Sequence, residues 1–246
     1  MPKINNPITD TTRQWLQAVR KAIIKLQQEY NLNRGMILTE GDLECHLFSK
    51  LLQEDELKGY HNSKNDSFSN TNTGSELKTS YVHSQVTWFK PDQKSGFEVD
   101  LTICNPKLLE VINIELFEQY TGKGFAYDGP CIAIEVKFIR DLQKAQIFGQ
   151  EDYLKFRDKL IPAKLENIKT ERYKISNENN IAFVCVVGCK NKEIFDKAKH
   201  YLGKHLADES KKTYKNLFPY IFYQDEIIWD KERLIQDYNR IRPANS

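Results

Sequence analysis

The chain has 246 residues, of which 40% are hydrophobic and 28% are charged, and its formal net charge is +2. This length and composition are ordinary for a globular protein with one large domain, and the small net charge neither favours nor excludes a polyanionic partner. Five cysteines, an odd number, argue against a disulfide framework and favour small buried residues in a reducing compartment. The sequence shows no signal peptide and no apolar run near the length of a membrane span, so we expect a cytoplasmic protein.

The first half of the chain predicts two helices followed by two strands. Apolar residues recur at helical spacing over 9–30, and a second helix is expected over 39–54. Residues 61–75 are rich in Ser, Thr, Asn and Gly, which favours a surface insertion over a functional lid. Strands are predicted over 80–89 and 96–104, with a turn between them.

The second half alternates strands and helices after a mixed linker over 105–130. It predicts a strand over 131–139, a charged helix over about 141–165 and a buried strand over 181–187. The remaining expected elements are a helix over 192–206, a hairpin formed by 220–223 and 226–229, and a helix from Asp230. This order predicts an α/β fold with a mixed central sheet flanked by helices. We expect a single domain over 1–246.

The expected strand over 131–139 carries two charges inside an apolar segment. Glu135 and Lys137 are two residues apart, so they point to the same face of the strand. Burying both charges is costly unless they are paired, bind a metal or lie in a solvated cleft. The pair is therefore either a functional site or a simple cross-strand ion pair.

A second carboxylate is predicted on the strand over 96–104. Alternation places Phe97, Val99, Leu101 and Ile103 on one face, and Glu98, Asp100 and Thr102 on the other. If this strand neighbours 131–139, Asp100 lies beside Glu135. Two converging carboxylates repel each other, and a divalent cation relieves that repulsion. Oxygen ligands favour Mg²⁺ or Mn²⁺ over Zn²⁺.

The helix over 39–54 supplies a third acid. At 100° per residue, Glu40 and Glu44 fall within the apolar stripe formed by Leu43, Leu47 and Leu51. An acid in this stripe is either close to a site in the sheet or located at the helix end, where the helix dipole favours a carboxylate. Glu40 and Glu44 are therefore both candidates for the third acid.

Together these residues resemble the PD-(D/E)XK nuclease superfamily, which has the restriction-endonuclease-like fold. The resemblance consists of Asp100 on one strand, Glu135-Val-Lys137 on a later strand and an acid on the preceding helix. It covers about residues 38–190 and implies an αβββαβ core. The helix over 9–30 and residues 191–246 lie outside it, the latter as a small C-terminal β/α appendage. Val99 replaces the motif's proline, and the gap between Asp100 and Glu135 implies an insertion.

The resemblance implies a Mg²⁺-dependent (or Mn²⁺-dependent) nuclease acting on DNA, as an endonuclease in restriction, anti-phage defence or repair. It makes Glu40 the first choice and Glu44 the second choice for the helix acid. Asp100, Glu135, the Val136 backbone carbonyl and Glu40 or Glu44 would hold the metal, and Glu40, Asp100, Glu135 and Lys137 would be the catalytic set. Lys137 would orient the attacking water. Candidate site-lining residues are His83, Gln85 and Glu98.

The expected partner is DNA, with RNA left open, no membrane, and a homodimer or a larger defence or repair complex compatible with the family. Eight lysines lie between Lys190 and Lys215, and Lys211, Lys212 and Lys215 are candidate nucleic-acid contacts; a solvated helix face is the alternative. A catalytically inactive nuclease-fold module that binds nucleic acid or a protein partner is the alternative function.

Overall fold

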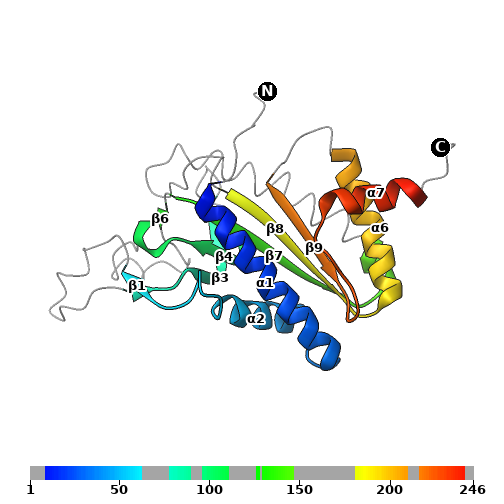
Figure 1. Cartoon of the computed structure of the whole chain (residues 1–246), viewed down its shortest axis with the longest axis horizontal. Coiled ribbons are helices and arrows are strands. Elements are labelled where there is room, and N and C mark those ends of the chain that lie inside the picture. Colours follow the sequence, from blue (N-terminus) through cyan, green and yellow to red (C-terminus); the bar gives the residue numbers. More distant parts are fainter. Residues whose placement is uncertain are drawn as a thin grey trace.

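In the computed structural model, the protein is an α/β structure built around a mixed six-stranded sheet with helices on both sides (Figure 1). The structure describes residues 9–62, 78–89, 96–110, 126–127, 129–146, 181–209 and 216–241. The predicted α/β class is therefore confirmed. The strand order across the sheet is β10-β9-β8-β7-β4-β3.

The strands predicted from alternation and from apolar runs are present with nearly the expected bounds. They are β3 (Val82–Phe89), β4 (Gly96–Cys104), β7 (Cys131–Ile139), β8 (Ile181–Cys189), β9 (Leu217–Phe222) and β10 (Ile227–Ile228). β3, β4 and β7 are antiparallel neighbours, whereas β8 runs parallel to β7 and β9 runs parallel to β8. The two central strands β7 and β8 are buried on both faces, which accounts for their nearly continuous apolar sequence.

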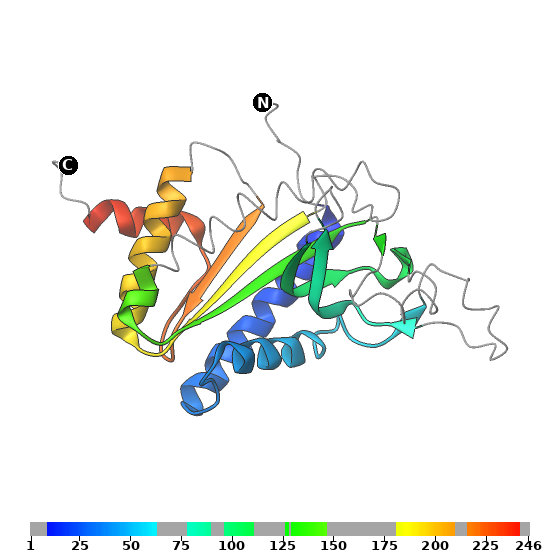
Figure 2. The same ribbon diagram turned by 180° about the vertical axis from the view of Figure 1, so that it is seen from behind.

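Two helices cover one face of the sheet. They are α1 (Asp10–Leu32) and α2 (Glu40–Leu51), and Figure 1 shows α1 crossing the strands with α2 beside it. Their apolar stripes pack on side chains from β4, β7 and β8 in one core cluster. The other face is covered by α6 (Lys192–Glu209) and α7 (Lys231–Ile241), which Figure 2 shows together at one end of the sheet.

The first helix is a part of the core, although it lies outside the region that the family resemblance covers. Trp15, Ile23 and Tyr30 of α1 are almost fully buried in the cluster beneath α2. Three of its polar residues, spaced four apart, also form ion pairs with the segment that includes α2 and follows it: Lys21 with Glu56, Lys25 with Glu54, and Glu29 with Lys50. These contacts fix α2 against α1, and α2 carries the candidate site acid.

The C-terminal segment is not an appendage, so this expectation was wrong. The hairpin of β9 and β10 is formed as predicted, but β9 pairs in parallel with β8 and extends the central sheet. α7 packs closely on α6: a Cβ atom placed on Gly203 would lie 2.5 Å from the Leu234 carbonyl oxygen. Burial of Ile221 and Leu234 explains why this segment belongs to the core.

Short paired elements close the bases of the two insertions. β1 (His61–Asn62) pairs with β2 (Lys78–Thr79), and β5 (Leu109–Glu110) pairs with β6 (Ala126–Tyr127), following the 3₁₀ turn η2 (Pro106–Leu108). Residues 63–75 of the predicted loop and residues 111–125 and 128 of the linker lie outside the described residues. So does most of the predicted helix over 141–165, of which 142–146 are helical. No helix in the described part of the chain combines the length and apolar character of a membrane span.

Candidate active site

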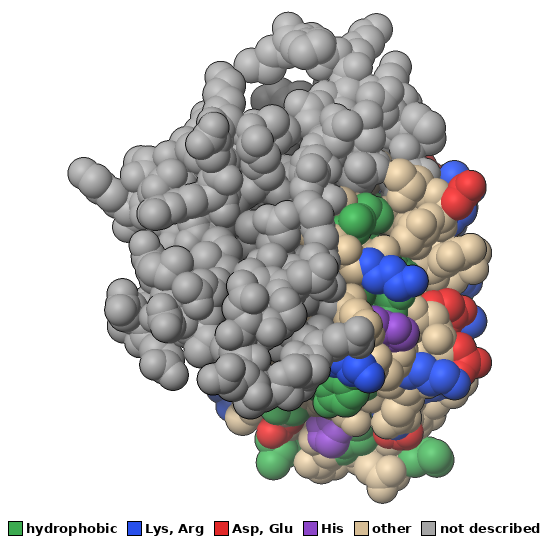
Figure 3. Space-filling view, turned by 90° about the vertical axis from the view of Figure 1, so that its left-hand side faces the viewer, with side chains coloured by type: hydrophobic (Ala, Val, Ile, Leu, Met, Phe, Trp, Pro, Cys, Tyr) green, Lys and Arg blue, Asp and Glu red, His purple; other side chains and the backbone are tan. Residues whose placement is uncertain are grey.

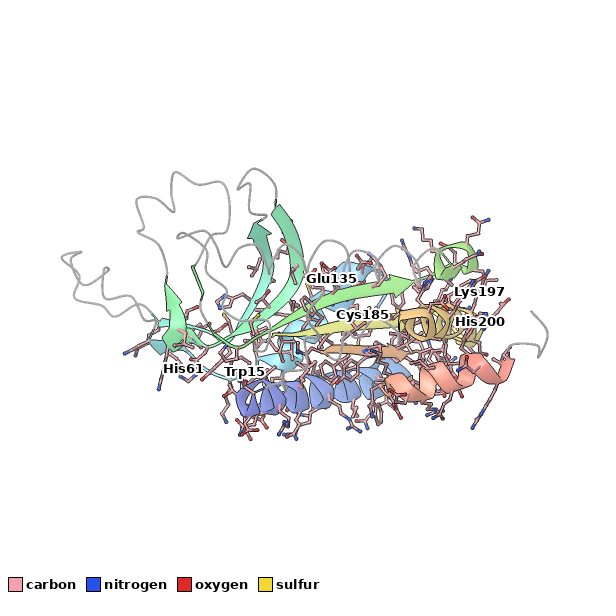
Figure 4. The ribbon with its side chains drawn as sticks, turned by 90° about the horizontal axis from the view of Figure 1, so that it is seen from above. Trp15, His61, Glu135, Cys185, Lys197 and His200 are labelled. Carbon is pink, nitrogen blue, oxygen red and sulfur yellow. The ribbon has the colours of Figure 1, made fainter. Side chains whose placement is uncertain are left out.

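The candidate site lies where β4 separates from β7. The antiparallel pairing of these strands runs from Cys104↔Cys131 to Leu101↔Ile134 and stops there. The next register position would place Asp100 opposite Glu135. Figure 4 shows β3 and β4 turning away from the other strands beyond this region, with Glu135 in the central part of β7. The predicted proximity of the two carboxylate-bearing strands is therefore present.

The Asp100 side chain bridges the two strands at this fork. The backbone N–H of Val136 donates a hydrogen bond of 2.7 Å to Asp100 Oδ2. This bond satisfies an amide of β7 at the place where the ladder with β4 has ended. Asp100 is half-buried, so its carboxylate can serve this amide and still be reached by solvent.

Glu135 is the most buried of the candidate acids, with 6% of its surface exposed. On β7 it follows Cys131 and Ala133 at intervals of two, on the side where these residues pack in the core cluster with α6. On β8 it faces Cys185, which is also buried. Removing an ionised carboxylate from water costs several kcal/mol unless other interactions compensate it. A carboxylate at such a buried position is therefore a candidate functional group.

Lys137 reaches from β7 to the first residue of α2. Its Nζ donates to Glu40 Oε1 at 3.0 Å, across 97 positions of sequence. The side chains are 35% and 43% exposed, so the pair lies at the border between core and solvent. The Lys137 ammonium is therefore paired with an acid of α2 as well as lying two residues from Glu135 on β7.

Glu40 and Glu44 occupy different places although both belong to the predicted stripe. Leu43, Leu47 and Leu51 are fully buried as expected, whereas Glu40 and Glu44 are half-buried. Glu40 contacts the lysine of the Glu-x-Lys triplet. The contact brings the helix, β7 and, through Val136, the Asp100 carboxylate of β4 into one site.

The three candidate site-lining residues lie on β3 and β4. His83 pairs with Thr102 of β4, and Gln85 would be the register partner of Asp100. Gln85 has a left-handed backbone conformation, φ 51°, and interrupts the ladder between Ser84↔Leu101 and Val86↔Val99. Glu98, two residues before Asp100 on β4, is exposed.

This irregularity corrects the predicted faces of β4. Leu101 and Ile103 share the core cluster beneath α1 and α2, as alternation predicts, but Val99 belongs to the cluster of the opposite face together with Val86. The change occurs at the Gln85–Asp100 position, where a left-handed residue breaks the regular pleat. The predicted alternation therefore holds for β4 from Leu101 onward and fails before Asp100, at Val99.

Burial lowers the pKa of His83 below its usual value, and a hydrogen bond with the Ser80 backbone opposes this change to a smaller extent. His83 is thus held in the neutral form. Four of the five cysteines are buried and free, and Cys45 on α2 is exposed. Burial raises the pKa of the Cys104 and Cys189 thiols, which keeps them protonated.

The carboxylates suit a hard cation by their chemistry. Asp100 and Glu135 offer oxygen ligands on the two neighbouring strands β4 and β7. Mg²⁺ commonly binds one or two carboxylates while keeping several waters. Within the described residues, no group of three or more His, Cys, Asp and Glu side chains is gathered closely enough to hold a metal by itself. By their donor chemistry alone, two carboxylates completed by water ligands suit Mg²⁺.

The predicted basic segment is described only in part. Lys211, Lys212 and Lys215 lie outside the described residues, so their role stays a prediction. On α6, Lys192 pairs with Asp196 at 3.3 Å, and Lys199 lies 4.0 Å from Asp237 of α7. Figure 3 shows acidic and basic side chains interspersed on the described part of the β1 end of the molecule.

Comparison of the chain with models of protein families, with curated proteins and with solved structures finds no match in any of the three. The functional assignment therefore depends on the residues of this chain.

Proposed function

We propose that the protein is a Mg²⁺-dependent nuclease of the restriction-endonuclease-like type that hydrolyses phosphodiester bonds of DNA. The observation that carries the proposal is the fork of β4 and β7, where Asp100 accepts the Val136 N–H and lies one position beyond the last register pair, Leu101↔Ile134, where Glu135 would be its partner. Lys137 follows Glu135 on the same strand face and contacts an acid of the preceding helix. The order helix, three antiparallel strands, then a parallel strand supports the αβββαβ core.

Each residue has a role that its position supports. Asp100 and Glu135, with the Val136 carbonyl, would hold Mg²⁺, which when bound polarises the phosphoryl oxygen and activates a water. The Lys137 ammonium would orient the attacking water and stabilise negative charge that develops on the phosphate. The Val136 N–H fixes the Asp100 carboxylate, so that this ligand needs little rearrangement before the metal binds.

The proposal is tested by incubating the purified protein with supercoiled plasmid, linear duplex and single-stranded DNA, and with an RNA of matched length. Each substrate is tested with Mg²⁺, with Mn²⁺ and with EDTA. Cleavage of DNA that requires the metal is the expected result. Among the substrates, nicking of closed plasmid would identify an endonuclease, whereas shortening of linear DNA alone would identify an exonuclease.

The alternative is a nuclease-fold module that binds without cutting. Retention of Glu40, Asp100, Glu135 and Lys137 in one site argues against it, because a binding module does not need this combination of acids and lysine. Metal-independent DNA binding without cleavage of any substrate would support the alternative and contradict the nuclease proposal.

A further inference from the structure

Glu40 begins α2, but the start of this helix is secured by other groups. Thr39 Oγ1 accepts a hydrogen bond from the Asp42 N–H, and Asp42 Oδ2 accepts from the N–H groups of Thr39 (2.9 Å) and Leu38 (3.0 Å). This reciprocal arrangement is a capping box, in which the acid of the third helical position satisfies the free amides. The Glu40 side chain is therefore not required as a cap.

The backbone of Glu40 is held firmly relative to the sheet. Leu43, Leu47 and Leu51 of α2 have no exposed surface. A Cβ atom placed on Gly188 of β8 would lie only 3.0 Å from Leu43 Cδ2, so the helix approaches the sheet closely one turn after Glu40. A carboxylate on this rigid platform can define the position of a group that it contacts.

The Glu40–Lys137 pair contributes little to folding stability, because both side chains are more than a third exposed and solvent screens their attraction. Its consequence is local. A lysine side chain has a flexible four-carbon stem that carries a mobile ammonium. The Glu40 oxygen restricts that ammonium to one place beside the fork.

We infer that Glu40 is a positioning residue for Lys137, and not a ligand of the metal. The inference rests on the proposed function and revises the role that the family resemblance implies for the helix acid. Glu40 Oε1 holds the lysine Nζ, so that the ammonium is already placed when substrate arrives. The metal is then left to Asp100, Glu135 and the Val136 carbonyl.

Glu40→Gln separates the two roles, because it removes the charge and preserves the shape. We expect kcat for DNA cleavage to fall about 10- to 100-fold, since misplacing a catalytic group costs rate and not ground-state binding. The Mg²⁺ concentration for half-maximal activity, and the affinity for Mn²⁺ measured on the protein without DNA, should both stay at the wild-type value. Glu226→Gln, which removes a similar half-exposed pair with Arg233, is the matched control and should change none of these quantities.

A double-mutant cycle tests the coupling directly. If Glu40 acts through Lys137, Glu40→Ala should cost no further activity once Lys137→Ala is present. Weaker Mn²⁺ binding by Glu40→Gln, or a fully additive loss in the double variant, would overturn the inference and return Glu40 to the metal site.

The inference can fail or survive independently of the nuclease proposal. In protein labelled with ¹³C at lysine, the order parameter of the Lys137 Cε group should fall in Glu40→Gln and stay unchanged in Glu226→Gln. This holds whether or not the protein cuts DNA. An unchanged order parameter in Glu40→Gln would show that the carboxylate does not position the lysine. If the wild-type protein cuts no substrate but the order parameter falls, only the nuclease proposal fails.

Discussion

The Asp100 carboxylate accepts the backbone N–H of Val136 at 2.7 Å, and this bond joins β4 to β7 one position beyond the end of their regular ladder. A side chain here replaces a main-chain partner. The fork between the strands is consequently stabilised by a candidate metal ligand, which couples the architecture of the sheet to the chemistry of the site.

The first prediction follows from this bond. Asp100→Asn keeps a carbonyl oxygen that can accept the Val136 N–H, whereas Asp100→Ala leaves this amide without that acceptor. We expect Asp100→Ala to lose about 1–3 kcal/mol of unfolding free energy in urea denaturation, and Asp100→Asn to lose less. Both should lose DNA cleavage, because neither offers a carboxylate. Equal stability of Asp100→Ala and the wild type would show that the bond does not hold the fork.

A second prediction concerns the left-handed backbone of Gln85. This conformation costs a non-glycine residue about 1–2 kcal/mol, and glycine adopts it without that cost. We expect the melting temperature to rise or stay level in Gln85→Gly and to fall in Gln85→Val. At the neighbouring exposed strand residue Ser84 the order should reverse, because valine favours regular strand geometry and glycine weakens it. The same ranking at both positions would contradict the observed conformation.

Much of the sheet could be predicted from local patterns, but its edges could not. The bounds of β4 and β7 follow from alternation and from a continuous apolar run. β9 begins at Leu217, three residues before the expected Tyr220, although Pro219 cannot donate to a ladder and is unusual inside a strand. Its parallel pairing with β8 depends on the fold of the whole chain, and no local pattern encodes it.

The site was predictable in its residue types and not in its contacts. Spacing of two indicated that Glu135 and Lys137 share a strand face, and the neighbouring acid Asp100 followed only if the two strands paired. The contact between Lys137 and Glu40 spans 97 positions and depends on how α2 docks. The left-handed Gln85 had no signal at all, since glutamine is not a residue type that favours that conformation.

A third prediction is a pH dependence of stability that originates at His83. Burial lowers the folded-state pKa of this side chain, while the unfolded chain has the usual value of about 6.5. Below that pH the unfolded state binds more protons than the folded state, so stability should decrease as the pH falls from 7 towards the lowered pKa. We expect His83→Gln to show a smaller loss of unfolding free energy between pH 7 and pH 5 than the wild type. Parallel curves for the two proteins would mean that His83 does not contribute.

A fourth prediction tests the packing of α7 on α6. A methyl group on Gly203 would lie 2.5 Å from the Leu234 carbonyl oxygen, a distance that requires the helices to separate. Gly203→Ala should therefore lose about 1–3 kcal/mol of unfolding free energy. Gly41→Ala on α2 is the matched helical control: its nearest neighbour would be 3.8 Å away, and it should gain up to about 1 kcal/mol. Wild-type stability of Gly203→Ala would contradict this close approach.

The central claim is that Glu135 and Lys137 carry out metal-dependent DNA cleavage. It is tested most directly by the Mg²⁺-dependent cleavage rate of plasmid DNA, measured in parallel for the wild type, Glu135→Gln, Lys137→Ala and the exposed control Lys190→Ala. We predict at least a ~100-fold loss for Glu135→Gln and Lys137→Ala with near-wild-type melting temperatures, and an unchanged rate for Lys190→Ala. A wild-type rate in either site variant would contradict the account.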